Sequence, residues 1–214
     1  MKVGVIDYGV GNLGSVMRAL EDLRVTPQLI ARPSDMRAMD RLILPGVGNF
    51  GDCSRLLMDG GWFDALREEV NSRDKSLLGV CLGMQLLASY SSEGASSSSE
   101  PLASGLGFIP GSVQHLGALG CALRVPHIGW NGVRRSVLSA GLFDGIPDET
   151  DFYFVHSYAF VTDDPQDILA TTDYGVRVTA AVRRGRVWGT QFHPEKSSRA
   201  GFRLLRNFID GHAC

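Results

Sequence analysis

Two kinds of hydrophobic pattern alternate along the first ninety residues of the chain. Short apolar runs with the length of buried strands cover residues 2–7, 27–30, 41–44 and 77–80. Longer stretches with apolar positions at helical spacing cover residues 13–23, 56–70 and 82–90, and Asn12 is a candidate cap for the first. Right-handed strand–helix–strand units of this kind predict an α/β fold: a mostly parallel central sheet with helices on both faces.

The pattern changes in the second half of the chain. Short strand candidates dominate there, at residues 113–116, 132–134, 152–160, 170–172, 178–183 and 186–192. The last two flank Arg184-Gly185 and favour a hairpin, so we expect an antiparallel strand extension. A helix is expected over 199–209. The serine-rich segment 95–104 is short enough to be a loop, and residues 1–214 are expected to form a single domain.

Charge and composition exclude several classes of function. The chain has 21 basic and 23 acidic residues and no basic stripe, which argues against binding to nucleic acid or anionic membranes. No apolar run reaches about 18 residues, and the N-terminus lacks the pattern of a signal peptide, so we expect a cytoplasmic protein. The cluster 183–186 is interpreted as a solvated hairpin turn. The four cysteines form no CxxC pair and are expected to be free thiols.

Cys81 lies between Gly79 and Gly83, where an apolar strand meets a helical pattern. This spacing is typical of a nucleophile elbow, in which a sharp turn exposes the central side chain and small neighbours allow close packing. A following helix would also direct its N-terminal amides at the sulfur. A buried cysteine packed as a small apolar residue fits the same pattern. The elbow by itself does not decide between the two.

The segment Gln191-Phe192-His193-Pro194-Glu195 adds a histidine and a carboxylate directly after a predicted strand. A histidine held by a carboxylate can activate a cysteine for acyl transfer and later protonate the leaving amine. The same residues could be a packed histidine and the capped start of the terminal helix. Neither alternative explains the cysteine elbow and this segment together.

Two glycine-rich loops follow the first and third predicted strands. Pro45-Gly46-Val47-Gly48 can supply backbone amides beside Cys81, and Gly46, Val47, Gly48 and Leu82 are the candidate oxyanion-loop residues. A phosphate cradle or an ordinary turn would show a similar spacing. The loop Gly9-Val10-Gly11 lacks the third glycine of a dinucleotide fingerprint. We therefore expect neither a nicotinamide nor another cofactor, and no metal.

The segments 45–48, 79–85 and 191–197 together resemble the class I, or triad-type, glutamine amidotransferases, which have a flavodoxin-like fold. Five further segments are similar to the glutaminase subunits of imidazole glycerol phosphate synthase. They are residues 7–12, 105–111, 125–131, 153–158 and 204–208.

The resemblance implies that a Cys81–His193–Glu195 triad hydrolyses L-glutamine to glutamate and ammonia. It implies a heterodimer with a (β/α)8-barrel cyclase subunit, which uses the ammonia to make imidazole glycerol phosphate and an aminoimidazole carboxamide ribotide. The residues it implies for glutamine binding are Gln85, Glu93, His156, Ser157 and Tyr158. Those it implies for the barrel interface are Asn12, Trp130 and Lys196, although Trp130 could instead cap the core. The segment 95–104 is longer than the usual loop of the family.

Two other functions are compatible with the sequence. A homologous amidotransferase could supply ammonia to a sugar-modifying synthase in surface polysaccharide assembly. A binding protein could keep the fold without catalysis, but the presence of Cys81, His193 and Glu195 argues against this.

Overall fold

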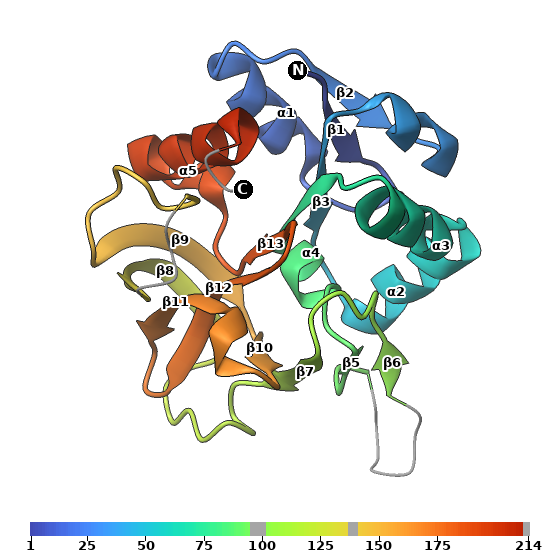
Figure 1. The fold of residues 1–214 in the computed structure, drawn as a ribbon. Helices are drawn as coiled ribbons and strands as arrows, with labels where there is room; N and C mark the ends of the chain where they lie inside the picture. The colour runs from blue at the N-terminus through green and yellow to red at the C-terminus, as the bar shows by residue number, and fades with distance from the viewer. Residues whose placement is uncertain (95–101, 137–140, 212–214) are drawn as a thin grey trace.

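The computed structural model describes residues 1–94, 102–136 and 141–211, and within them nine strands form one mixed sheet (Figure 1). Five neighbouring strands are parallel: β2 (Pro27–Ile30), β1 (Val3–Ile6), β3 (Arg41–Gly46), β4 (Ser76–Cys81) and β13 (Val187–Thr190). The sheet continues with antiparallel strands β12 (Arg177–Arg184), β11 (Ile168–Asp173), β8 (His127–Arg135) and β9 (Thr150–His156). The predicted parallel sheet and its antiparallel extension are therefore both present.

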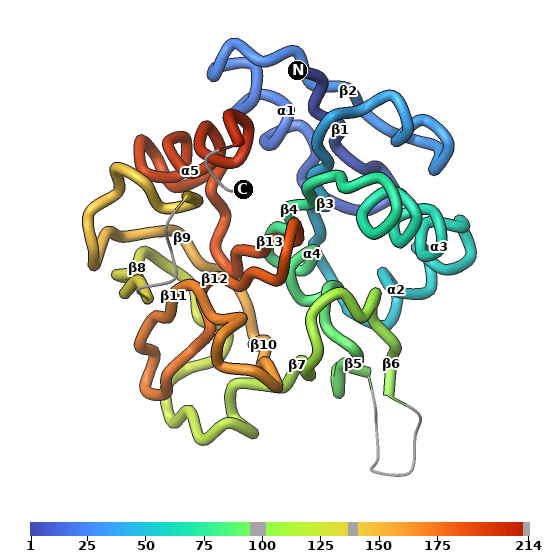
Figure 2. Tube along the Cα trace, in the orientation of Figure 1, coloured from blue at the N-terminus to red at the C-terminus, as the bar shows by residue number. Residues whose placement is uncertain are grey.

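A second sheet lies at the end of the molecule remote from α1 (Figure 2). Its strands, in order, are β10 (Tyr158–Thr162), β7 (Gly111–His115), β5 (Tyr90–Ser91) and β6 (Ala103–Ser104). The helices are α1 (Leu13–Asp22), α2 (Phe50–Asp59), α3 (Trp62–Arg67), α4 (Leu82–Gln85) and α5 (Ser198–Asp210). Short 3-10 turns cover Pro33–Ala38, Pro165–Asp167 and Pro194–Lys196, and a π-helical turn covers Glu68–Ser72.

The parallel strands are buried on both faces because successive side chains point to opposite sides. Val5 and Ile43 pack toward α1 and α5, whereas Ile6 and Leu42 pack toward α2 and α3. Figure 1 shows these two helix pairs on opposite sides of the central strands. This arrangement explains why the strands appear in the sequence as continuous apolar runs rather than alternating ones.

Two of the predicted helices have different bounds. The stretch 56–70 is broken by Gly61, whose φ is 73°, and its first helix begins earlier, at Phe50, because the Asn49 side chain caps the Asp52 amide at 3.1 Å. Asn12 occupies the cap position of α1, but its side chain makes no capping hydrogen bond.

The stretch 82–90 is helical only to Gln85. The carbonyls of Leu86, Leu87 and Ala88 accept amides from the segment 106–109, at 2.8–3.1 Å, instead of continuing a helix. Tertiary hydrogen bonds thus replace the helical ones that the apolar spacing predicted.

The predicted strand 152–160 is divided by Ser157 into β9 and β10, which belong to different sheets. In the serine-rich segment, Ala103 and Ser104 form β6, and residues 95–101 lie outside the described residues. Cys53, Cys81 and Cys121 are free thiols, as predicted, and Cys214 is also outside the described part.

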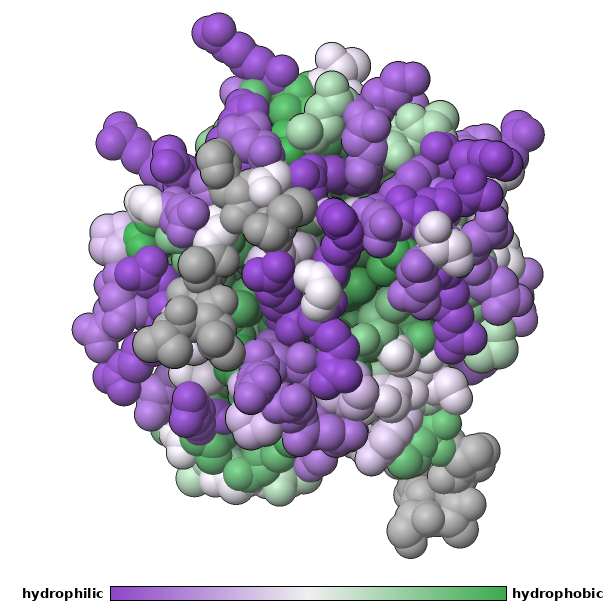
Figure 3. All heavy atoms as spheres, viewed as in Figure 1, coloured by the Kyte–Doolittle hydropathy of each residue, from purple (hydrophilic) through white to green (hydrophobic). Residues whose placement is uncertain are grey.

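The face of the molecule drawn in Figure 3 is largely hydrophilic, with apolar side chains visible in scattered places between polar ones. Among the described residues, no helix combines the length and apolarity that a membrane crossing requires.

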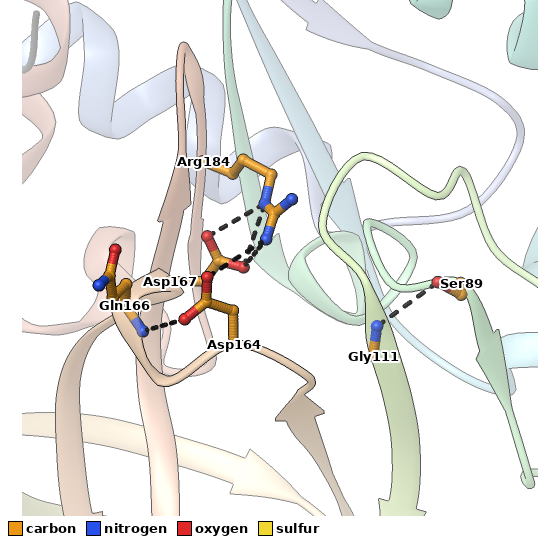
Figure 4. Close-up of polar contacts among 6 residues, drawn as sticks. All are labelled: Ser89, Gly111, Asp164, Gln166, Asp167 and Arg184. Atoms are coloured by element: carbon orange, nitrogen blue, oxygen red, sulfur yellow. Dashed lines mark hydrogen bonds and ion pairs between the residues drawn. The ribbon is translucent and has the colours of Figure 1, made fainter.

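The hairpin of β12 and β13 at Arg184-Gly185 is confirmed by its antiparallel pairing. Arg184, Gly185 and Arg186 are exposed, as predicted for a solvated turn. Two of the arginines also make contacts at the turn: Arg183 stacks on Trp188 at 4.0 Å, and Arg184 donates from Nε and Nη2 to the buried Asp167 (Figure 4). A planar guanidinium and a carboxylate in this two-point contact hold β12 against the turn before β11. Figure 4 also shows the Gly111 amide donating to Ser89 Oγ, which joins β7 to the segment after α4.

Candidate active site

Cys81 is the last residue of β4, and α4 begins at the next residue. Its backbone has φ 55° and ψ −111°, a conformation that non-glycine residues rarely adopt. A Cβ at Gly83 would lie 1.8 Å from the Leu44 carbonyl oxygen, and one at Gly79 would lie 2.5 Å from the Gly83 oxygen. Both flanking positions therefore require glycine, and the turn has the strained geometry predicted for a nucleophile elbow. Because α4 has only four residues, its dipole is smaller than the sequence predicted.

His193 and Glu195 form a buried pair at the C-terminal end of β13. Their Nδ1 and Oε1 atoms are 2.7 Å apart, and the two side chains are 3% and 2% exposed. The Glu195 carboxylate accepts a hydrogen bond from His193 Nδ1, so Nε2 is the nitrogen that can interact with a second partner. Nε2 is buried and makes no hydrogen bond of ordinary geometry within the described residues, but the ring interacts with the Cys81 side chain. The structure thus brings the three predicted triad residues together.

The backbone around His193 is held by two residues to which the sequence assigned no role. The His193 amide donates to the Tyr153 carbonyl at 2.9 Å. Ser197 Oγ donates to the His193 carbonyl at 2.6 Å and accepts the Tyr153 amide at 3.0 Å. These bonds fix the turn after β13 against β9.

Burial by itself lowers the pKa of His193, but interactions with Cys81 and Glu195 outweigh it and raise this pKa to about 9. Protonated His193 is therefore favoured between the two partners at neutral pH. A histidine that keeps its proton beside a sulfur can stabilise a thiolate and then protonate a leaving amine.

Replacing Glu195 with glutamine should lower the pKa of His193 and remove a pH-dependent part of the folding free energy. The raised pKa stabilises the fold fully below pH 6.5, the unfolded value, and this contribution is lost as pH rises through about 9. The difference in unfolding free energy between wild type and Glu195→Gln should therefore shrink from pH 6 to pH 9. Urea titrations and the NMR titration of the His193 ring measure both effects.

Glu149→Gln is the control for that experiment. Glu149 also lies near a cationic group, at 3.0 Å from Arg134, but this pair is exposed. The difference in unfolding free energy between wild type and Glu149→Gln should not change with the protonation of His193. An equal pH trend in both variants would show that the trend does not come from the His193–Glu195 pair.

A cavity of about 390 Å³ lies against Cys81 and His193. Its other lining residues are Val47, Gly48, Leu82, Gln85, Glu93, Pro126, Val155, His156, Ser157 and Tyr158. The structure therefore gathers all five predicted glutamine-binding residues and three of the four predicted oxyanion-loop residues. Gly46 is the exception: it packs against the turn after Cys81, where a Cβ would be 2.8 Å from the Gly83 amide nitrogen.

Gln85, in the wall of this cavity, is held by buried polar groups. Its Nε2 donates to the Tyr158 carbonyl and to Gln191 Oε1, each at 3.0 Å. Gln191 Nε2 in turn lies 3.8 Å from the Cys81 sulfur. Sequence reasoning assigned no role to Gln191, although it begins the segment that contains His193.

The Glu93 side chain reaches the first residue of α2, where its Oε2 accepts the Phe50 amide at 2.7 Å. Burial raises the pKa of Glu93 despite this hydrogen bond. On the facing loop, Gly48 has a φ of 95°, and the Val47 carbonyl accepts the Cys53 thiol at 3.4 Å. This hydrogen bond ties the Val47–Gly48 loop to α2 through the Val47 carbonyl.

Two of the three predicted interface residues lie beside Tyr153, and the third lies near the His193–Glu195 pair. Trp130 is 53% exposed, and its ring centroid is 6.0 Å from that of Tyr153. Lys196 Nζ lies 5.9 Å from the same tyrosine ring. Asn12 lines a small cavity with His193 and Glu195. These positions are compatible with a shared surface, and their interface role stays a prediction.

A larger cavity, of about 1050 Å³, lies elsewhere, over β8, β10, β11 and β12. It contains none of the predicted site residues. Among the residues that the structure describes, no histidine, cysteine, aspartate and glutamate side chains gather in a group that could hold a metal ion.

Comparison with known proteins decides the family. The family described as "Glutamine amidotransferase class-I" matches residues 4–211. The chain belongs to this family. The resemblance stated from the sequence is confirmed, and this class I glutamine amidotransferase is an enzyme of the glutaminase type, as predicted.

Two relatives are named imidazole glycerol phosphate synthase subunit HisH. The Moorella thermoacetica protein is 45% identical over 206 residues, which cover 96% of this chain and 93% of the relative. The Synechococcus sp. (strain JA-2-3B'a(2-13)) protein is 42% identical over 211 residues, covering 98% and 93%. A crystal structure of a glutamine amidotransferase superposes with a TM-score of 0.74 at 21% identity, covering 99% of both chains. This last likeness confirms the predicted fold class.

Proposed function

We propose that this chain is the glutaminase subunit of an imidazole glycerol phosphate synthase in histidine biosynthesis. The observation that carries the proposal is the strained Cys81 beside the buried His193–Glu195 pair, at the wall of a cavity that Gln85 also lines. The names and the 40–45% identity of the relatives support the choice of synthase over a sugar-modifying enzyme or a silent binding protein.

In the proposed reaction, the Cys81 sulfur attacks the side-chain amide carbon of glutamine. The carbonyl oxygen gains negative charge, which amides of the Val47–Gly48 loop and Leu82 would stabilise. His193 then donates its proton to the departing nitrogen, so that ammonia leaves and a thioester remains. Water attacks the thioester, His193 takes its proton, and glutamate leaves as the Cys81 thiolate and protonated His193 are restored. Glu195 keeps the imidazole ring oriented throughout.

The ammonia would pass to a (β/α)8-barrel cyclase subunit, which forms imidazole glycerol phosphate and an aminoimidazole carboxamide ribotide. We propose that residues 1–214 act as one domain and that Asn12, Trp130 and Lys196 contact this barrel in a heterodimer. Exposed aromatic and cationic side chains beside the turn that carries His193 suit such a contact.

Glutamine hydrolysis by the isolated chain should be slow and should rise at least about tenfold when the barrel subunit and its nucleotide substrate are bound. The physical reason is the Val47–Gly48 loop, whose Val47 carbonyl is held by Cys53 and whose Gly48 can adopt more than one conformation at little cost. Glutamate release with and without the partner measures this.

Added ammonium salt should support synthesis by the complex without glutamine. Full glutaminase turnover by the chain alone would contradict the proposed dependence on a partner. A complex that makes no imidazole glycerol phosphate from either nitrogen source would contradict the proposed synthase.

A further inference from the structure

A chain of hydrogen bonds leads from β8 into the wall of the active-site cavity. Asn131 Nδ2 lies 3.4 Å from His127 Nε2, and His127 Nδ1 lies 3.0 Å from His156 Nε2. His156 Nδ1 lies 2.8 Å from the Tyr158 carbonyl. Of these side chains, only His156 lines the cavity, and the proposed mechanism uses neither histidine.

In this series of hydrogen bonds, the Tyr158 carbonyl fixes which atom donates in each one. A carbonyl can only accept, so the proton of neutral His156 is on Nδ1 and its Nε2 is an acceptor. His127 must therefore donate from Nδ1, and its Nε2 accepts the Asn131 amide. Burial lowers the pKa of both histidines to about 4, so both rings are neutral at physiological pH and each has one defined tautomer.

Packing leaves His127 little freedom to turn away. Its ring is stacked between Phe154, at 4.7 Å between centroids, and Tyr174, at 3.9 Å. Tyr174 is itself anchored through its hydroxyl to the Arg124 carbonyl at 2.8 Å. The donor at His127 Nδ1 is therefore held in one place.

The Tyr158 carbonyl connects this histidine pair to glutamine binding. It accepts both His156 Nδ1 and Gln85 Nε2, at 2.8 and 3.0 Å. Without the His127 donor, His156 Nε2 would be a buried acceptor with no partner. Nothing would then hold the Nε2 side of the His156 ring, and the hydrogen bond from its Nδ1 to the Tyr158 carbonyl would be weakened.

We propose that His127 is a positioning residue for glutamine binding. It holds the His156 ring through Nε2, and His156 Nδ1 then holds the Tyr158 carbonyl where it orients Gln85. The inference rests on the proposed function, because it takes glutamine to be the ligand of this cavity.

Two substitutions separate the donor from the packing. His127→Phe keeps a ring between Phe154 and Tyr174 and removes both nitrogens. His127→Asn loses the stacked ring but keeps an amide donor near the place of Nδ1. In the complex with the barrel subunit, His127→Phe should raise the KM for glutamine about 5- to 50-fold with a smaller effect on kcat. His127→Asn should stay within about threefold of wild type.

Nitrogen NMR of the His156 ring gives an independent readout. His156 Nδ1 should be protonated in all three proteins, because the Tyr158 carbonyl accepts from it. The Nε2 shift should be that of a hydrogen-bonded acceptor in wild type and His127→Asn, and that of an unbonded acceptor in His127→Phe. Synthesis from ammonium salt should be the same in all three proteins, since it does not use the glutamine cavity.

An unchanged KM and an unchanged Nε2 shift of His156 in His127→Phe would overturn the inference. Equal impairment of both variants would also overturn it, because the loss would then come from packing rather than from the donor. A wild-type complex that does not hydrolyse glutamine would overturn the proposed function itself, and the inference with it. The wild-type measurement therefore distinguishes the two failures.

Discussion

Cys81→Ala should reduce glutamine-dependent synthesis by the complex at least about 10⁴-fold while synthesis from ammonium salt stays near the wild-type rate. The sulfur is the nucleophile of the proposed reaction, and an alanine methyl group cannot form the thioester. The loss should appear in kcat for glutamine. Measuring imidazole glycerol phosphate formation with each nitrogen source separates hydrolysis from synthesis.

The matched control for that experiment is Cys121→Ser. Cys121 is another buried thiol, but it belongs to a separate small cluster, where it donates to the Tyr174 carbonyl at 3.1 Å. Serine keeps that donor, so both activities should remain. If Cys81→Ala also lost the ammonium-dependent reaction, the cysteine would be required for assembly, and the proposed division of labour between the subunits would be wrong.

The parallel half of the fold was predictable because its strands are buried on both faces. Runs such as 41–44 and 77–80 then contain little except apolar residues, and their order with the helices defines the sheet. The predicted helix 82–90 was wrong beyond Gln85, because the hydrogen bonds to the segment 106–109 are not visible in local spacing. The division of 152–160 at Ser157 was missed for a similar reason: both parts are apolar enough for a strand.

Residues of the candidate site were predictable where the chemistry requires a fixed local pattern. Cys81 is flanked by glycines that the turn requires, and His193 and Glu195 are separated by one proline in a single turn. His127 and Gln191 were not found, since each acts through partners more than 25 residues away in sequence. A lone histidine or glutamine gives no sign of such contacts before the fold is known.

The strained backbone at Cys81 depends on one close approach between α4 and β3. Gly83 lies directly against the Leu44 carbonyl, at the end of the strand that leads into the Val47–Gly48 loop. The nucleophile and the candidate oxyanion loop are therefore placed by the same contact. A side chain at this position would push them apart.

Gly83→Ala should accordingly lower the free energy of unfolding by several kcal/mol, about 3–5, because its Cβ would lie 1.8 Å from the Leu44 oxygen and backbone atoms must move. Gly14→Ala is the matched control: no atom lies within 4 Å of its Cβ position in α1, and alanine should stabilise that helix by about 0.5–1 kcal/mol. Urea unfolding of both variants measures the difference. If Gly83→Ala were as stable as wild type, the backbone of Cys81 could not depend on this contact, and the elbow would have to be held by other residues.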